Sequence, residues 1–130
     1  MTGRSSATAA PTVFVIDDDP AVRIALERLF RGAGWAVRTF ASAEDFLQQD
    51  LDGVHACLVV DVHLGRMSGL ELHATLGSHA GAMPIILTSG VDDMNMERQA
   101  LSLGAIAFFR KPFEASALLD SVRQGLAVGR

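Results

Sequence analysis

The chain is poor in cysteine, in positive charge and in long apolar segments. Its 130 residues contain one cysteine, Cys57, so no disulfide can form within the chain and a reducing compartment is the natural expectation. Lysine and arginine total 11 against 15 aspartates and glutamates, which gives a net charge of −4 without the basic excess typical of nucleic-acid binding. No apolar stretch approaches the roughly 18 residues that a membrane helix needs. We therefore expect a cytoplasmic protein that binds neither nucleic acid nor a membrane.

The composition is that of one folded domain with short ends. Hydrophobic residues make up 49% of the chain and charged residues 20%, and a length of 130 residues suits a single domain. Residues 1–11 are rich in Ser, Thr and Ala and lack the apolar centre of a secretory signal, so they predict a flexible tail. Residues 12–127 are expected to form the domain, and residues 128–130 its end or the start of a linker.

Five short apolar runs are separated by segments with helical periodicity. Four of the runs are continuous rather than alternating, which is typical of strands covered on both faces in a parallel sheet. The second run alternates more and suits an edge strand. The runs cover residues 13–16, 36–40, 56–60, 85–87 and 105–109.

Capping signals stand where the helices are expected to begin and end. Asp19 precedes apolar residues spaced as on one face of a helix, and Gly32 and Gly34 suit the end of that helix. Ser68 and Glu71 form a capping box. The five helices are expected to begin near residues 20, 42 and 68 and to cover about residues 92–103 and 113–127.

The resulting order is a strand followed by a helix, five times over. Short connections and right-handed crossovers arrange such units in an open parallel sheet with helices on both faces. For five strands, the flavodoxin-like α/β arrangement has the order 2-1-3-4-5, and ligands bind beyond the carboxyl ends of the strands, where the order reverses. We therefore expect one α/β domain with its site at that edge of the sheet.

Charged residues gather at the carboxyl ends of the predicted strands. Asp17 and Asp18 follow the first strand, Asp61 the third and Lys111 the fifth, while Thr88 ends the fourth. Carboxylates about 4–6 Å apart repel each other by up to about 4 kcal/mol per pair at an effective dielectric near 20, and one lysine offsets only one charge. Mg²⁺ commonly binds one or two carboxylates together with waters and a phosphate oxygen. The pattern predicts a magnesium site prepared to receive a phosphoryl group.

Each of these residues also has an ordinary structural explanation. The aspartates after the first strand can cap a helix, Asp61 can be a turn residue, Lys111 a solvated side chain and Thr88 a β-branched strand residue. Their joint occurrence at the ends of four strands favours the functional interpretation. Other candidates are weaker, because the four histidines include no i, i+4 pair suited to zinc and Cys57 lies inside an apolar run.

Five motifs resemble those of the receiver domain of bacterial two-component response regulators. The resemblance covers about residues 12–127, and the segments 19–23 and 40–46 are most similar to receivers that precede LuxR-type helix-turn-helix domains. The motifs are Val15-Ile16-Asp17-Asp18-Asp19, Val59-Val60-Asp61, Met67-Ser68-Gly69, Ile86-Leu87-Thr88-Ser89-Gly90 and Phe108-Phe109-Arg110-Lys111-Pro112-Phe113.

The resemblance implies a phosphoacceptor and its metal site. Asp61 would accept the phosphoryl group, and Asp17, Asp18 and Asp61 would hold Mg²⁺, with Mn²⁺ as an alternative cation. The backbone carbonyl of His63 would be a further ligand. Lys111 would pair with Asp61 and then with a phosphoryl oxygen.

The resemblance also implies a switch and two positions that influence the lifetime of the aspartyl phosphate. Thr88 would hydrogen-bond the phosphoryl group, and the ring of Phe108 would turn inward when Thr88 moves toward the phosphate. His63 and Gly90, two residues beyond Asp61 and Thr88, would influence the rate at which the aspartyl phosphate hydrolyses.

The implied activity is that of a signalling domain rather than an enzyme. A sensor histidine kinase or a phosphotransfer protein would supply the phosphoryl group, which the domain would transfer to itself with Mg²⁺ and lose by slow autodephosphorylation. The face formed by the fourth helix, fifth strand and fifth helix would then change. That face would control a partner, a homodimer contact or an effector domain.

One position departs from the family's pattern. Members usually have proline at the fourth position after the phosphoacceptor, where this chain has Gly65. Glycine loosens a loop that proline would stiffen by fixing φ. The sequence therefore predicts that Gly65→Pro orders this loop.

Three other functions fit the sequence less well. A Mg²⁺-dependent phosphatase with an aspartyl nucleophile usually has a second aspartate two residues later, where this chain has His63. A flavodoxin-type binding module needs a phosphate-cradling Gly/Ser/Thr loop after the first strand, where this chain has three aspartates. A receiver that no longer accepts phosphate and acts as a scaffold is the third alternative, and the complete acidic set argues against it.

Overall fold

A five-stranded parallel sheet forms the centre of the protein in a computed structural model that describes residues 11–50, 54–65, 67–79, 83–90 and 94–128. The strand order is β2-β1-β3-β4-β5, and every pair is parallel. Both the order and the direction of the strands confirm the sequence prediction. The strands are β1 (Thr12–Ile16), β2 (Ala36–Phe40), β3 (Ala56–Asp61), β4 (Ile85–Ser89) and β5 (Ala107–Arg110).

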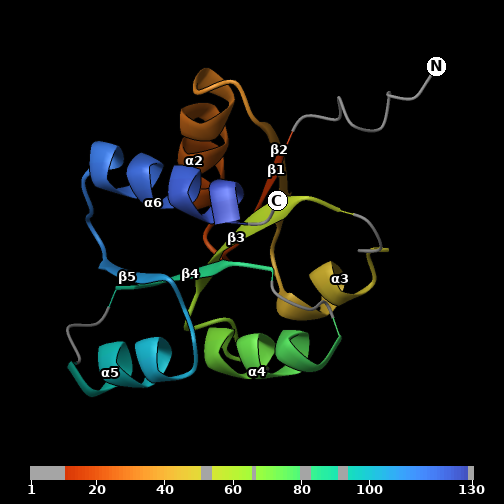
Figure 1. Ribbon diagram of the computed structural model, residues 1–130, viewed down its shortest axis with the longest axis vertical. Coiled ribbons are helices and arrows are strands. Elements are labelled where there is room, and N and C mark those ends of the chain that lie inside the picture. Colours follow the sequence, from red (N-terminus) through yellow and green to blue (C-terminus); the bar gives the residue numbers. More distant parts are fainter. Residues whose placement is uncertain (1–10, 51–53, 66, 80–82, 91–93, 129–130) are drawn as a thin grey trace.

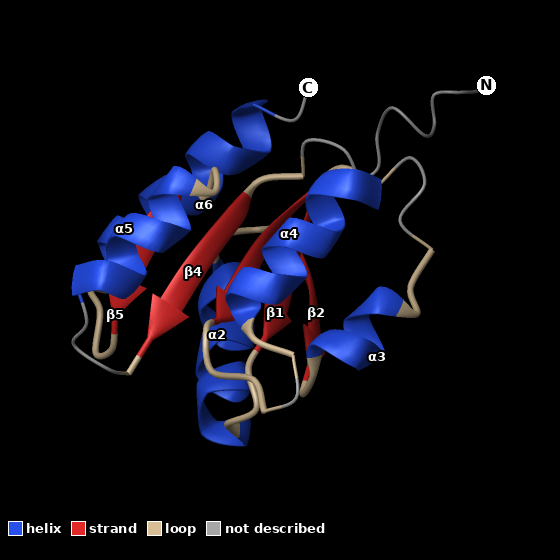
Figure 2. Ribbon diagram, turned by 90° about the horizontal axis from the view of Figure 1, so that it is seen from below, coloured by secondary structure: helices blue, strands red, loops and turns tan. Residues whose placement is uncertain are grey.

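Helices cover both faces of this sheet (Figures 1 and 2). Figure 1 shows α2 (Pro20–Gly32) and α6 (Ala115–Val128) on one face. The opposite face carries α3 (Ala43–Leu47), α4 (Gly69–His79) and α5 (Met94–Ser102). None of the described helices is both long enough and apolar enough to cross a membrane.

The central strands supply two separate apolar cores, one on each face. Every residue of β3 and β4 is buried, as the continuous apolar runs predict for strands covered on both sides. Successive residues of β1 alternate between the cores, so that Val15 packs with α2 and α6 while Phe14 packs with α3 and α4. The site at the strand ends is therefore mounted on a rigid, doubly covered sheet.

Side-chain caps begin three of the helices where the sequence predicts them. The carboxylate of Asp19 accepts a hydrogen bond from the backbone N–H of Ala21 at the start of α2, and Ser42 caps α3. Ser68 and Glu71 form a reciprocal capping box before α4, with distances of 2.9 and 3.0 Å.

Two helices end in the same glycine-dependent turn. After α2, the N–H of Trp35 donates to the carbonyl of Phe30 and the N–H of Gly34 to that of Arg31, with Gly34 at φ +96°. Gly104, at φ +103°, ends α5 with the same two bonds. This is the Schellman arrangement, and glycine is the residue that adopts its positive φ without strain.

The turn after α5 explains why β5 begins later than the sequence predicts. The apolar run begins at Ala105, whose N–H is bonded to the carbonyl of Ala100 and closes the helix end. The strand itself therefore begins at Ala107. Helix α6 likewise begins at Ala115, two residues after the predicted start, and extends through Val128.

The two ends of the domain lie together at the amino ends of the strands. Pro11 and Ala127 line one pocket of about 530 Å³ together with Trp35, His55 and other residues. The carbonyl of Pro11 accepts a hydrogen bond from the N–H of Ala36, and His55 Nε2 lies 2.6 Å from the carbonyl of Leu126. Most of the predicted tail, residues 1–10, lies outside the described part of the chain.

Candidate functional site

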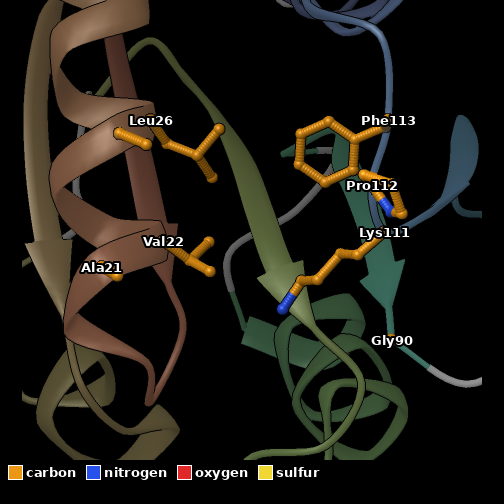
Figure 3. Close-up of a pocket in the computed structure, with 8 residues that line it drawn as sticks. Ala21, Val22, Leu26, Gly90, Lys111, Pro112 and Phe113 are labelled. Atoms are coloured by element: carbon orange, nitrogen blue, oxygen red, sulfur yellow. The ribbon is translucent and has the colours of Figure 1, made fainter.

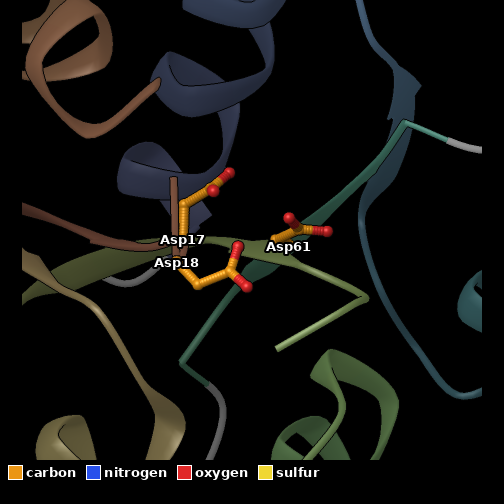
Figure 4. A group of neighbouring side chains, drawn as sticks. All are labelled: Asp17, Asp18 and Asp61. Carbon is orange, nitrogen blue, oxygen red and sulfur yellow. The ribbon is translucent and has the colours of Figure 1, made fainter. Parts of the chain in front are cut away.

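Three carboxylates meet at the carboxyl ends of β1 and β3 (Figure 4). Ile16 pairs with Val60 in the parallel register, so the residues that follow them, Asp17 and Asp61, emerge side by side. Asp17 is 2% exposed and Asp61 is 6% exposed, whereas Asp18 is open to solvent. One carboxylate oxygen from each of the three residues lies within 4.8 Å of the others. The acids that the sequence predicts to be neighbours are thus brought together.

Lys111 places its ammonium group between the two buried acids. Its Nζ lies 2.8 Å from Oδ2 of Asp17 and 3.1 Å from Oδ2 of Asp61. Its backbone N–H donates to the carbonyl of Ser89, which fixes the residue directly after β5. Burial alone would lower the pKa of Lys111, but its hydrogen bonds to Asp17 and Asp61 outweigh burial and raise the pKa above its usual value. The lysine therefore stays charged.

One lysine does not neutralise the site. Burial raises the pKa of Asp17, although the hydrogen bonds from Lys111 and from the N–H of Asp19 lower it. Three carboxylates against one ammonium leave an excess of two negative charges when all are ionised. The acidic pocket can therefore hold a metal ion, and oxygen donors of this kind suit a hard divalent cation such as Mg²⁺.

Backbone hydrogen bonds fix the position of Asp61. Its Oδ1 accepts from the N–H of His63 at 2.9 Å, and the N–H of Val62 donates to the carbonyl of Thr88 at 2.8 Å. The N–H of Gly69 then donates to the carbonyl of Val62. A Cβ at Gly69 would lie 2.6 Å from the carbonyl oxygen of Asp61, so only glycine fits there without moving the backbone of that aspartate.

The remaining predicted site residues are Thr88, Gly90, Phe108 and His63. Thr88 pairs with Asp61 between β3 and β4 and is 2% exposed, while Gly90 is exposed just after β4. Phe108 pairs with Leu87 and is partly buried against the core on the α4 and α5 face. His63 is exposed. Thr88 is thus brought to the acids, and Phe108 lies on the strand beside it.

An apolar groove of about 520 Å³ opens beside Lys111 (Figure 3). Residues of α2, among them Val22 and Leu26, form one wall, and the segment after β5, with Pro112 and Phe113, forms the other. Lys111 contributes to the lining, so the groove leads directly to the charged cluster.

The expectation for Gly65 is wrong. Its φ is +75°, which lies in the left-handed region, whereas proline fixes φ near −65°. Gly65→Pro therefore cannot order the loop in its present path, because the backbone would have to be rebuilt. Nothing lies within 4 Å of a Cβ placed at Gly65, so the objection to the substitution is the backbone angle and not crowding of the Cβ.

Sequence reasoning gave no individual role to Gly69 or to Arg23, although both lie in or beside recognised motifs. Nη1 of Arg23 donates to the carbonyl of Asp17 at 2.6 Å. No periodicity signals this contact, because the start of α2 decides where the long side chain reaches.

The sheet order, the acidic pocket and the lysine together define the class of receiver domains, which are signalling domains. The sequence model of the family described as "Response regulator receiver domain" matches residues 13–123. The chain belongs to this family.

Similar proteins include regulators of transcription. The chain is 42% identical over 121 residues to the transcriptional regulatory protein TdiR of Thauera aromatica, covering 93% of this chain and 53% of TdiR. It is 39% identical over 114 residues to the transcriptional regulatory protein FixJ of Azorhizobium caulinodans, covering 88% of this chain and 54% of FixJ. The chain thus spans about half the length of these curated relatives.

Solved structures share both the fold and part of the sequence. The response regulator StyR superposes with a TM-score of 0.85 at 43% identity, covering 93% of this chain and 61% of that one. The structure described as FixJ-N superposes with a TM-score of 0.83 at 33% identity, covering 90% of this chain and 94% of that one.

Proposed function

We propose that this domain is a phosphorylation-dependent switch of a two-component system and that Asp61 is its phosphoacceptor. One observation carries the proposal: the Asp61 carboxylate is held by Lys111 on one oxygen and by the N–H of His63 on the other, beside two further acids. A carboxylate held in this way is positioned as a nucleophile, with a cationic group beside it to offset the charge of the incoming phosphoryl group.

Mg²⁺ fits the donor set of the site. The carboxylates of Asp17, Asp18 and Asp61 would hold it with the backbone carbonyl of His63, and Mn²⁺ is the alternative cation. The excess of two negative charges in the cluster matches a divalent ion. When bound, the ion supplies charge neutralisation for the phosphoryl oxygens.

The transfer itself needs positioning more than covalent help from the protein. A carboxylate oxygen of Asp61 attacks the phosphorus of a phosphohistidine, an oxygen–phosphorus bond forms, and the nitrogen–phosphorus bond breaks with its electron pair returning to the histidine. Lys111 pairs with a phosphoryl oxygen, and the hydroxyl of Thr88 donates to another. Slow hydrolysis by water ends the signal, at a rate influenced by His63 and Gly90.

The phosphoryl donor in this proposal is a sensor histidine kinase or a phosphotransfer protein in the cytoplasm. The groove beside Lys111 offers such a partner an apolar surface next to the nucleophile. On phosphorylation, Thr88 moves and Phe108 turns inward. The face formed by the fourth helix, fifth strand and fifth helix, which are α5, β5 and α6 in the structure, then changes.

The changed face would control the output. Four large apolar side chains are exposed on the described surface, and three of them, Leu101, Leu103 and Ile106, lie at the end of α5 and just before β5. This apolar surface supports a homodimer contact there. Because TdiR and FixJ are about twice as long as this chain and are named as transcriptional regulatory proteins, we also propose an effector domain of the LuxR-type helix-turn-helix class. DNA binding would then belong to that domain and not to this chain.

The direct experiment incubates the purified chain with Mg²⁺ and acetyl phosphate and measures the intact mass. We expect one phosphoryl adduct that is absent in Asp61→Asn and after chelation of the metal. Asp120→Asn, a change at an exposed aspartate of α6, is the matched control and should leave the adduct unchanged. Failure of the wild-type chain to form an adduct with this donor and with histidine kinases would refute the proposal.

A further inference from the structure

The backbone of Asp17 is held at both of its polar groups, although β1 ends one residue earlier. Its N–H donates to the carbonyl of Phe40 on β2 at 3.1 Å. Its carbonyl lies beyond the last paired residue of the strand and accepts from Nη1 of Arg23 at 2.6 Å. This carbonyl belongs to the peptide unit that joins Asp17 to Asp18, so the guanidinium fixes the direction in which the chain enters Asp18.

Asp18 is the member of the acidic cluster that most needs such support. Asp17 and Asp61 are buried, and each is bonded to Lys111. Asp18 is exposed, and within the described ranges its carboxylate has no hydrogen bond or ion pair. Among the residues that the structure describes, what holds this carboxylate within 4.8 Å of the other two is therefore its own backbone.

The start of α2 places Arg23 for this contact. Asp19 caps the helix with its side chain, and the N–H of Arg23 donates to the carbonyl of Asp19 at 3.1 Å. The long side chain of Arg23 is half-buried and turns back from the first turn of the helix to Asp17. The side chain of Arg23 therefore joins the two ends of the segment from Asp17 to Arg23, and the cap by Asp19 fixes its middle.

We infer that Arg23 is a positioning residue of the metal site, which holds the Asp17 carbonyl and thereby directs the Asp18 carboxylate toward Asp61. This inference rests on the proposed binding of Mg²⁺. Groups that orient metal ligands without touching the ion typically change metal affinity by about 10- to 100-fold when removed.

Charge and position predict opposite effects of removing Arg23, which makes the inference testable. Loss of a positive charge near three carboxylates strengthens the attraction of a cation. Loss of the contact to the Asp17 carbonyl frees the Asp18 peptide unit and weakens chelation. If Arg23 acts by position, Arg23→Met must weaken Mg²⁺ binding despite the more favourable charge.

The experiment is an isothermal titration of the metal-free chain with MgCl₂ at constant ionic strength. We expect Arg23→Met to bind Mg²⁺ about 10-fold more weakly than the wild type, and Arg23→Lys, which keeps a donor, to recover part of the loss. Arg28→Met, at an exposed arginine of the same helix, is the control for charge and should bind at least as tightly as the wild type. Amide hydrogen exchange at Asp18 in the metal-free protein should accelerate in Arg23→Met and not in the control.

A double-mutant cycle tests whether Arg23 acts through Asp18. In an Asp18→Asn background, Arg23→Met should cause little further loss of Mg²⁺ affinity. Unchanged or tighter Mg²⁺ binding by Arg23→Met, or a full additional loss in the Asp18→Asn background, overturns the inference alone. Absence of Mg²⁺ binding by the wild-type chain overturns the inference together with the proposed metal site.

Discussion

Asp17 is a site residue whose buried charge lowers the stability of the folded state. Its carboxylate is 2% exposed, and burial raises its pKa even though Lys111 donates a hydrogen bond to it. A raised pKa in the folded state means that this group stabilises the fold fully only while it is protonated, and that stability is lost as the pH rises above about 3.8, the unperturbed value. At neutral pH the charged form of Asp17 is therefore unfavourable even with Lys111 bonded to it, and a further cation such as Mg²⁺ would offset this cost.

Asp17→Asn should consequently stabilise the metal-free chain. At pH 7 with a chelator present, we expect a melting temperature a few degrees higher, the shift that about 1 kcal/mol produces in a domain of this size. The gain should shrink as the pH falls toward 4, and added Mg²⁺ should raise the melting temperature of the wild type more than that of the variant. Thermal unfolding followed by circular dichroism measures all three, and a melting temperature below that of the wild type in chelator would contradict the explanation.

The thiol of Cys57 gives a second effect of burial, far from the acids. Burial raises its pKa from 9.0 to about 12. The thiolate fraction at a given pH is then lower by roughly three orders of magnitude than in the unfolded chain, so iodoacetamide should label the native protein only through unfolding.

The same shift predicts alkaline destabilisation. The stabilising contribution of the protonated thiol is complete below about pH 9 and is lost as the pH rises toward 12. Urea midpoints measured between pH 8 and 10.5 should fall more steeply in the wild type than in Cys57→Ala. The variant keeps Lys111, so any pH dependence that comes from this lysine is common to both proteins. Equal slopes would mean that the thiol does not carry the effect.

At the residue scale, sequence reasoning placed the acids, Thr88 and Lys111 because strand ends are easy to locate in continuous apolar runs. It failed at Gly65, because a sequence does not reveal the sign of φ at one loop residue. It also did not foresee the contact of Arg23 with Asp17, since the direction of a long side chain depends on where its helix begins.

At the scale of elements, the turns after α2 and α5 decide the boundaries. Trp35 packs on Phe30 with ring centroids 6.0 Å apart, which adds the hydrophobic contact that usually accompanies a Schellman turn. The strand and helix types could be predicted, because buried parallel strands and amphipathic helices have distinct periodicities. Their ends were predicted only to within about two residues. At β5 the difference arises because Ala105 continues an apolar run and yet closes a helix.

Two neighbouring glycines should respond to alanine in opposite ways. Gly34→Ala should destabilise the protein by about 1 kcal/mol, because φ at this position is +96° and nothing crowds the added Cβ. Gly32→Ala should stabilise it by up to about 0.5–1 kcal/mol, because Gly32 is the last residue of α2 and its Cβ would also be free of contacts. Chemical denaturation of both variants measures the pair, and a shared sign would refute the conformational explanation.

At the scale of the whole molecule, the proposed signal passes from the acidic pocket across β4 to β5. Thr88 is paired with Phe109, and Leu87 is paired with Phe108. A shift of Thr88 would therefore act directly on its neighbours in β5. Arg110 of β5 is in turn bonded to Glu97 of α5 at 3.1 Å. Movement at the site therefore has a short mechanical route to the α5–β5–α6 face.

Hydrogen exchange can follow this route. Acetyl phosphate with Mg²⁺ should change amide protection in α5 and β5, while α3 and β2, at the opposite edge of the sheet, should exchange as before. The Asp61→Asn protein treated in the same way is the control and should show no difference. Changes spread evenly over all helices would argue against a switch confined to one face.

The meeting of Pro11 and Ala127 at one pocket has a practical consequence for protein engineering. Since the domain's entry and exit points line the same pocket at the rim away from the acids, a linker that spans this pocket would join them. The domain is thus suited to circular permutation, or to insertion as a cassette into a surface loop of a host protein, with its acidic rim left facing solvent.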